Sequence, residues 1–445
     1  MKAFTEPLLS LAGFEEMTKT AEKSSGLISV TGCIDAQKSQ MIYAFGGHRK
    51  NKLIVTFGEQ KAKELYDEYS FFDKEVVYYP SKDVLFYQSD IRGNLLTAER
   101  IRALKAIREQ ERVTLVTTFD ALMNTMAPIE KMWENVLTLE QGQLLDLKEI
   151  QAALIRMGYE KEYQVQTMGQ FSVRGGILDV FPLTEENPIR IELWGDEIDT
   201  IRYFDCESQK SIENTDRVSI YPAAELVLSD EEKAGGIDKL KAEAKRVSDK
   251  LRKQMKTEEA HRVTVMADEL TEEWGELSMY AGMDAFLSYF FDERVGILDY
   301  FNPSDSLIFF DELTRCTEQG KLTETEFSES MKQRLAMGYI LPGQMNGLFT
   351  EKEIVAKLGK YSCIALAALD NKANGLHQLG SYGIHCQSVS PYNNSFELLI
   401  KDLKRYKKNG YRVILLSGSR TRAKRLSEDI TDQGITCFYT ENYDH

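Results

Sequence analysis

The residues best suited to chemistry lie in Gly32–Ser39, GCIDAQKS, which carry most of a phosphate-binding loop. In the pattern G-x-x-x-x-G-K-[ST], backbone amides cradle phosphates, the lysine reaches them and the hydroxyl holds magnesium. Lys38 and Ser39 occupy the lysine and hydroxyl positions. Gln37 replaces the second glycine, and its side chain would crowd the approach of a phosphate to the backbone.

Asp311 and Glu312 are the acidic residues that could complete such a site, because they end the apolar run Ser306–Glu312. Carboxylates at this place hold magnesium and orient water in nucleotide hydrolases. A working motor also needs a second lobe that supplies an arginine, and the C-terminal segment is too short and lacks matching motifs. We therefore predict a vestigial nucleotide site without a cofactor, composed of Gly32, Gln37, Lys38, Ser39, Asp311 and Glu312. The alternative is a nucleotide-dependent enzyme that uses the last four.

A second candidate is the antiparallel sheet predicted from Gly169–Pro182 and Pro188–Asp205. Apolar residues alternate with polar ones there, so one face is expected to be buried and the other charged. Arg174 is expected on the charged face beside Gly175 and Gly176, where small residues let a partner approach. The candidate binding residues on this face are Lys161, Ser172, Arg174, Glu192 and Arg202. An ordinary solvated surface fits the pattern equally well.

A third candidate is the basic stretch from Lys404 to Arg425, in which Tyr406 and Tyr411 are interleaved. Lysine and arginine can bind backbone phosphates while aromatic rings stack on bases, so a DNA-binding module is a further alternative. Cations also favour helix C-termini, which explains the same residues without a ligand.

Strand and helix patterns alternate through residues 1–119, which indicates a parallel α/β sheet flanked by helices. The pattern changes near Asp120, and the antiparallel segment predicts an inserted α+β domain at 120–205. Residues 206–334 are expected to return to the first lobe through the strand Ser306–Glu312. The charged helix Ser229–Met255 on this route is typical of a solvated face.

The polar residues Thr317–Leu348 suggest an irregular connection, with a linker at 335–349. A small α/β domain is then predicted at 350–445. Its expected strands are Cys363–Ala368, Val413–Ser417 and Thr436–Tyr439, and its expected helices are Phe396–Lys407 and Arg420–Gln433.

Composition favours a soluble, cytoplasmic and monomeric chain of several domains. The 445 residues are 42% hydrophobic, but none of the apolar runs approaches the roughly 20 residues that a membrane span requires. The net charge of −15 argues against a protein whose main function is to bind the phosphate backbone of nucleic acids. Six scattered cysteines and five histidines form no pattern of metal ligands.

Several stretches resemble the bacterial transcription-repair coupling factor (Mfd) family: YYPSKDVLFYQSDI, LVTTFDALM, GQFSVRGGILDVFP, RIELWGDEIDTIRYFD and LLSGSRTRAKRL. The resemblance implies a degenerate helicase-like lobe similar to the repair protein UvrB, an inserted domain that binds UvrA, and a small α/β domain. Arg174, and with it Lys161, matches basic positions that meet UvrA in UvrB-like proteins, whereas Ser172 stands where they tend to carry arginine. The segment between Tyr79 and Ala98 is too short for the hairpin with which UvrB clamps DNA.

Taken together, these features predict a non-catalytic adaptor that brings UvrA to stalled RNA polymerase. The resemblance assigns RNA polymerase, double-stranded DNA, ATP and magnesium to other parts of the full-length family proteins, which are ATP-dependent DNA translocases. The chain ends at His445, shortly after the expected small domain, and so resembles a fragment of such a protein.

Overall fold

A parallel seven-stranded sheet forms the centre of the computed structural model, which describes residues 2–11, 13–45, 49–83, 93–276, 282–369 and 374–442. The strand order is β15-β1-β14-β13-β2-β4-β3, and every neighbouring pair is parallel. The strands are β1 (Gly26–Thr31), β2 (Asn51–Thr56), β3 (Val76–Tyr79), β4 (Val113–Thr118), β13 (Ser306–Asp311), β14 (Ser362–Ala367) and β15 (Gln378–Gly383).

Helices cover both faces of this sheet, because alternate strand residues enter two separate cores. Leu53 and Val55 belong to one core and Ile54 to the other. One face is covered by α1 (Lys2–Leu9), α2 (Phe14–Lys23), α3 (Asp35–Phe45) and α4 (Glu59–Tyr69), and the opposite face by α5 (Gly93–Glu109), α6 (Phe119–Met123), α7 (Ile129–Glu134), α12 (Leu313–Ala336) and α13 (Glu351–Leu358). The predicted α/β lobe and its return strand at Ser306–Glu312 are confirmed.

The predicted start of the small domain at residue 350 is wrong. The strand expected there, β14, lies inside the central sheet, where Cys363 pairs with Leu27 on one side and Ile308 on the other. Strand β15 then extends the same sheet along the other edge of β1. The lobe therefore continues through Gly383, since β14, an interior strand of its sheet, and the edge strand β15 come from this late part of the chain.

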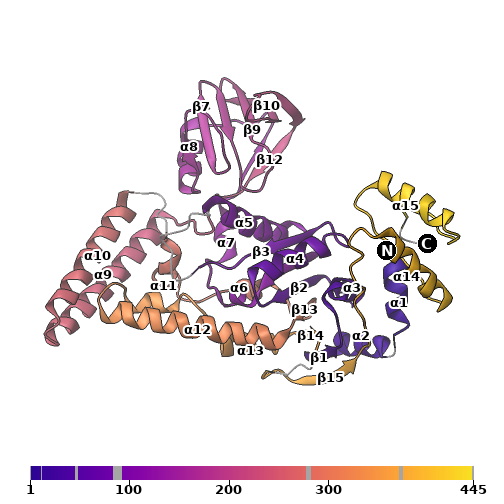
Figure 1. Ribbon diagram of the computed structural model, residues 1–445. Coiled ribbons are helices and arrows are strands. Elements are labelled where there is room, and N and C mark those ends of the chain that lie inside the picture. The colour runs from indigo at the N-terminus through magenta and orange to yellow at the C-terminus, as the bar shows by residue number, and fades with distance from the viewer. Residues whose placement is uncertain are drawn as a thin grey trace.

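The inserted domain stands apart from the lobe (Figure 1) and spans 137–220 rather than the predicted 120–205. Helices α6 and α7 precede it and pack in the lobe core. Its six-stranded sheet has the order β11-β10-β9-β8-β7-β6, and α8 packs beside it. These elements are α8 (Leu147–Arg156), β6 (Glu160–Lys161), β7 (Gln170–Arg174), β8 (Ile177–Val180), β9 (Ile189–Trp194), β10 (Glu197–Phe204) and β11 (Ser211–Thr215).

Two paired strands carry the chain into and out of this domain. Strand β5 (Leu137–Glu140) pairs antiparallel with β12 (Arg217–Ile220). Just beyond β12, the buried Glu225 accepts a hydrogen bond from Arg100 Nε of α5 at 2.6 Å and pairs with Lys82 Nζ at 3.0 Å. A buried charge cluster thus fixes the joint between the domain and the lobe.

Most of the connection predicted at Thr317–Leu348 is the long helix α12, and the linker predicted at 335–349 is packed against the lobe. Met331 and Phe327 of α12 are buried, as are Ile340 and Leu341 beyond it. The remaining elements of this part are the hairpin of α9 (Asp230–Lys253) and α10 (Thr257–Glu276), the short α11 (Leu287–Phe290), and the 3-10 turns η2 (Met283–Phe286), η3 (Ile297–Tyr300) and η4 (Pro342–Asn346).

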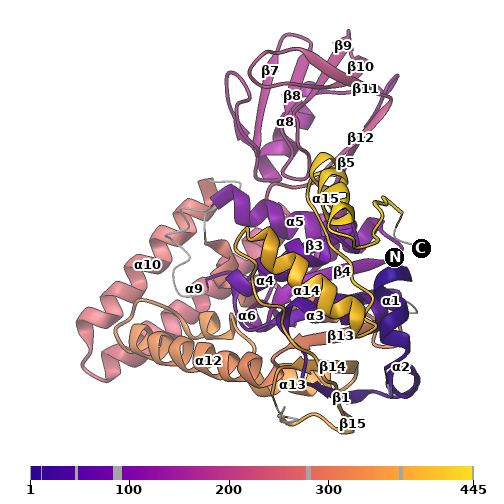
Figure 2. The same cartoon turned by 45° about the vertical axis from the view of Figure 1, so that its right-hand side comes forward.

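The C-terminal unit contains α14 (Phe396–Lys408) and α15 (Arg420–Asp432), as predicted, beside α1 (Figure 2). The segments Val413–Ser417 and Thr436–Tyr439 are described but are not strands, so the prediction of strands there is wrong. Within the described part of the chain, no helix is long and apolar enough to cross a membrane. Residues 84–92, where the clamping hairpin was expected to be missing, lie outside the described residues.

Candidate functional site

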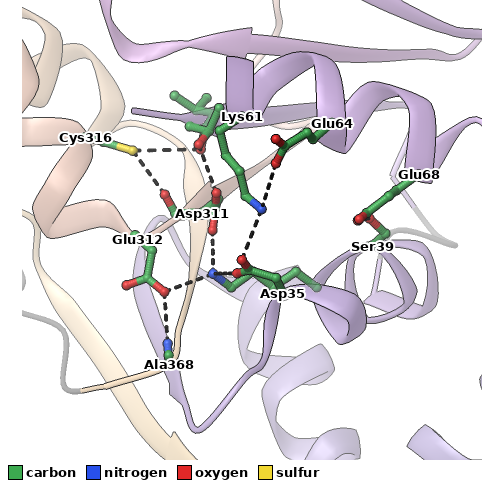
Figure 3. A network of polar contacts seen from close by, with 12 residues as sticks. Asp35, Ser39, Lys61, Glu64, Glu68, Asp311, Glu312, Cys316 and Ala368 are labelled. Atoms are coloured by element: carbon green, nitrogen blue, oxygen red, sulfur yellow. Dashed lines mark hydrogen bonds and ion pairs between the residues drawn. The ribbon is translucent and has the colours of Figure 1, made fainter. Parts of the chain in front are cut away.

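The first candidate site is a cluster of charges around Lys38, in the first turn of α3. Figure 3 shows its carboxylates, Asp35, Asp311 and Glu312. The side chain of Lys38 is 1% exposed, and its Nζ lies 2.5 Å from Asp311 Oδ1, 2.9 Å from Glu312 Oε1 and 3.0 Å from Asp35 Oδ1. Burial opposes the charged ammonium, but the carboxylates, Asp311 foremost, outweigh it and raise the pKa of Lys38. The ammonium of the lysine that would bind phosphate is therefore already paired with three carboxylates of its own chain.

The backbone of the loop is also occupied by protein groups. Cys33 N–H donates to the carbonyl oxygen of Ala367 at 3.0 Å, and Ile384 N–H donates to that of Thr31 at 2.9 Å. Gly32 has φ +84°, and a Cβ built on it would lie 2.0 Å from the Ile384 carbonyl oxygen. The segment that follows β15 therefore covers the loop, and only glycine fits beneath it.

The remaining predicted residues do not complete a nucleotide site. Ser39 Oγ donates to Glu68 Oε2 at 3.3 Å, so this hydrogen bond joins Ser39 to α4 rather than to the Asp311 cluster. Gln37 Oε1 is buried and has no hydrogen-bond partner among the described residues. The cluster brings together Lys38, Asp311 and Glu312 as predicted, and it also includes Asp35, the first residue of α3. Lys38 Nζ contacts three carboxylates of this chain, so its ammonium is not free to meet the phosphates of a nucleotide.

The second candidate site is the outward face of the inserted sheet, where register places charged residues in rows. Arg190 pairs with Asp179 on one side and with Arg202 on the other, while Glu192 pairs with Ile177 and Thr200. Directly opposed like charges such as Arg190 and Arg202 repel each other unless each finds a carboxylate. The two arginines indeed contact different carboxylates: Arg190 that of Asp179, and Arg202 that of Glu192.

Arg190 and Arg174 share the carboxylate of Asp179, which is 1% exposed. Arg190 donates from Nε to Oδ1 at 2.7 Å and from Nη2 to Oδ2 at 2.8 Å, with its guanidinium 4.3 Å from the ring centroid of Phe204. Arg174 Nη2 donates to Oδ2 at 3.0 Å, and its side chain remains 36% exposed. Arg174 is thus held in place at one end and open to a partner at the other.

Arg202 and Glu192 form a second bidentate pair on this face. Arg202 Nη2 lies 2.6 Å from Glu192 Oε1 and Nη1 lies 2.9 Å from Oε2. The hydrogen bonds from Arg202 lower the pKa of Glu192. Both side chains stay half-buried, and Lys161 is exposed on β6 with its Nζ 2.7 Å from Gln151 Oε1.

Ser172 lies on the predicted face but is buried, so the expectation that it is exposed there is wrong. Its Oγ donates to the Tyr163 carbonyl oxygen at 2.8 Å, because the loop after β6 folds over this part of the sheet. The sequence reasoning also missed Asp179 and Arg190. The signal was present, since a lone aspartate inside the apolar strand ILDVFP requires a cationic partner when it is buried.

The basic stretch Lys404–Arg425 is partly neutralised by nearby carboxylates. Arg405 pairs with Asp402 at 3.0 Å and Arg420 with Glu441 at 3.4 Å. DNA binding by this stretch stays a prediction.

Comparison with known proteins finds a match for the inserted domain. Residues 137–226 match the family model described as the UvrB interaction domain. The transcription-repair-coupling factor of Bacillus subtilis is 26% identical over 391 residues, covering 87% of this chain and 33% of the relative. That of Staphylococcus haemolyticus is 25% identical over 418 residues, covering 92% and 34%, and that of Staphylococcus aureus strain MRSA252 is 26% identical over 435 residues, covering 95% and 35%.

The chain spans about a third of the length of these relatives. The matched segment begins at β5, near the observed start of the inserted domain, and extends six residues past β12. The chain is therefore similar over most of its length to the transcription-repair-coupling factors, and its inserted domain matches the model of the UvrB interaction domain.

Proposed function

We propose that this chain is the UvrA-recruiting part of a transcription-repair coupling factor. The observation that carries the proposal is the charged outward face of the inserted domain, which lies within the segment matching the UvrB interaction domain. Arg174 presents a partly exposed guanidinium that Asp179 holds in a fixed orientation. Arginine held in this way loses little side-chain entropy on binding, which favours it as an interface residue.

The same proposal assigns no catalysis and no cofactor to this chain. The candidate for nucleotide chemistry among the described residues, the Lys38 cluster, contains three carboxylates, and the segment after β15 covers the loop before it. ATP, magnesium, double-stranded DNA and RNA polymerase would engage other parts of a full-length coupling factor. The adaptor would link that machinery to excision repair.

Calorimetric titration of the chain with purified UvrA tests the proposal. We expect binding that Arg174→Ala weakens by at least tenfold, about 1.4 kcal/mol. Arg156→Ala is the matched control, because Arg156 is an exposed arginine on α8 of the same domain. Circular dichroism confirms that each variant is folded. Equal binding by both variants and the wild type would place the contact elsewhere, and no binding by the wild type would refute the recruitment role.

A second titration tests the absence of a nucleotide site. We expect labelled ATP with Mg²⁺ to show no binding at micromolar concentrations, because the anion would have to displace Asp311 and Glu312 from Lys38. Magnesium-dependent binding in that range would instead favour the nucleotide-dependent enzyme.

A further inference from the structure

Trp194 is an exposed tryptophan at the end of β9, where the inserted sheet turns back into β10. Its relative exposure is 84%, whereas Trp274 is fully buried and Trp133 packs against the lobe core. An indole left in water forgoes a large burial energy. Single exposed apolar residues are common on protein surfaces, so the surroundings of Trp194 decide its meaning.

The surroundings form an open, partly apolar end of the sheet. Trp194 pairs with Glu197, which also bridges to Leu144, and Leu144 is 74% exposed. Gly175 and Gly195 flank the same end with φ +60° and +64°, and a Cβ added to either would meet no atom within 4 Å. Another molecule can therefore approach both the indole and the adjoining backbone.

A shallow hollow of about 730 Å³ adjoins the indole. Trp194 and Ile198 contribute to its lining. Its acidic lining residues are Glu140, Glu197, Asp199 and Asp216, and its basic one is Arg217. The apolar tip is therefore rimmed mainly by negative charge. A complementary surface would offer an apolar pocket with a basic edge.

The tip is continuous with the charged face that carries the proposed function. Trp194 follows Glu192 by two residues on β9, so both side chains point to the same side of the sheet. The loop after β6 covers the other end of the face at Ser172, whereas the end with Arg174 and Trp194 is open. Interface hot spots are enriched in tryptophan and arginine.

We propose that Trp194, supported by Leu144, is the apolar anchor of the UvrA contact and enters a pocket of UvrA that has a basic rim. The inference rests on the proposed function and adds the residue expected to contribute most apolar burial. Arg174 and the Glu192–Arg202 pair then orient the partner around that anchor.

Fluorine NMR of the whole chain labelled with 5-fluorotryptophan tests this inference. The chain contains three tryptophans, and Trp194→Phe identifies the resonance of Trp194 by its loss. On addition of unlabelled UvrA, we expect the Trp194 resonance to shift and its indole to become less accessible to solvent. The resonances of Trp133 and Trp274 should change less. In parallel calorimetry, Trp194→Ala should weaken binding by at least tenfold. Phe438→Ala is the control, because Phe438 is a 75% exposed aromatic residue of the C-terminal unit.

The outcomes separate the two proposals. A shifted Trp194 resonance together with weaker binding of Trp194→Ala supports the anchor. Normal binding of Trp194→Ala with an unchanged Trp194 resonance overturns the anchor and leaves recruitment intact. Failure of the wild type to bind UvrA overturns recruitment, and the anchor with it.

Discussion

The Lys38 cluster and the outward face of the inserted sheet both contain ion pairs with a buried aspartate, but the pairs differ in how far they are exposed. In the cluster, Lys38 is buried and contacts three carboxylates, so no donor is left for a ligand. On the sheet, Asp179 is equally buried, but Arg174 reaches from it to the surface. An ion pair closed on all sides maintains the fold, whereas a pair with one open end can also present a charge to a partner.

The difference also explains why the phosphate-loop motif is by itself an ambiguous guide to function. Lys38, Asp311 and Glu312 are residue types that a nucleotide site requires. In this chain they contact one another directly, so the two carboxylates compensate the positive charge of Lys38. Residue identity alone does not distinguish a site from its remnant. Burial and partner geometry do.

The largest expected effect follows from Lys38→Ala. Removing the lysine would leave Asp311 as a buried carboxylate without its cation, and we expect a loss of about 3–5 kcal/mol in unfolding free energy at pH 7. Urea denaturation followed by circular dichroism measures it. Lys61→Ala is the control, because Lys61 pairs with Asp35 from a more exposed position and should cost clearly less. A loss below about 1 kcal/mol for Lys38→Ala would mean that the cluster is not a structural unit.

The second effect concerns Glu225 at the joint between the inserted domain and the lobe. Burial alone would raise its pKa, but Arg100 and Lys82 lower it to about 2. Because the folded pKa lies below the unfolded value of about 4.5, the stabilisation is complete above that pH and is lost as the pH falls towards 2. We expect a loss on the order of 3 kcal/mol over this window.

Urea denaturation between pH 7 and pH 2 measures this dependence, with Glu225→Gln as the comparison. The variant should be less stable at pH 7 and should lose less stability on acidification. Parallel pH profiles for the two proteins would show that Glu225 does not carry the dependence, and that the joint is unlike the Lys38 cluster.

The smallest expected effect is the coupling between Glu192 and Arg202 on the sheet face. These side chains are 32% and 24% exposed, so solvent screens their attraction. A double-mutant cycle of Glu192→Ala and Arg202→Ala should give a coupling of about 0.5–1 kcal/mol that shrinks in 1 M NaCl. A coupling above about 3 kcal/mol would show that the face is as closed as the Lys38 cluster, contrary to its proposed role as a docking surface.

Local pattern sufficed to predict the α/β lobe, the inserted antiparallel sheet and the charged face. It could not place β14, because parallel pairing of Cys363 with Leu27 joins residues far apart in the sequence. Nor did it reveal α12, whose polar composition suggested a connection. Cys316, Gly320, Phe327 and Met331 are buried at helical spacing, which was the readable signal.

The interpretation of the candidate sites depended on cross-strand register. The sequence placed Arg174 and Glu192 on one face correctly, but only the pairing of strands shows that Asp179 holds two arginines. Ser172 was misjudged because a loop covers it, and alternation along a strand carries no information about loops.

The pairing of β5 with β12 has a consequence for how the inserted domain could be transferred between proteins. Leu137 and Ile220 stand opposite each other in this ribbon, so the inserted domain begins and ends about 5 Å apart. A segment with adjoining ends can be removed and its gap closed by a short turn, or transplanted into a surface loop of another scaffold. The inserted domain is therefore built as a segment that can be transferred as a unit from one scaffold to another.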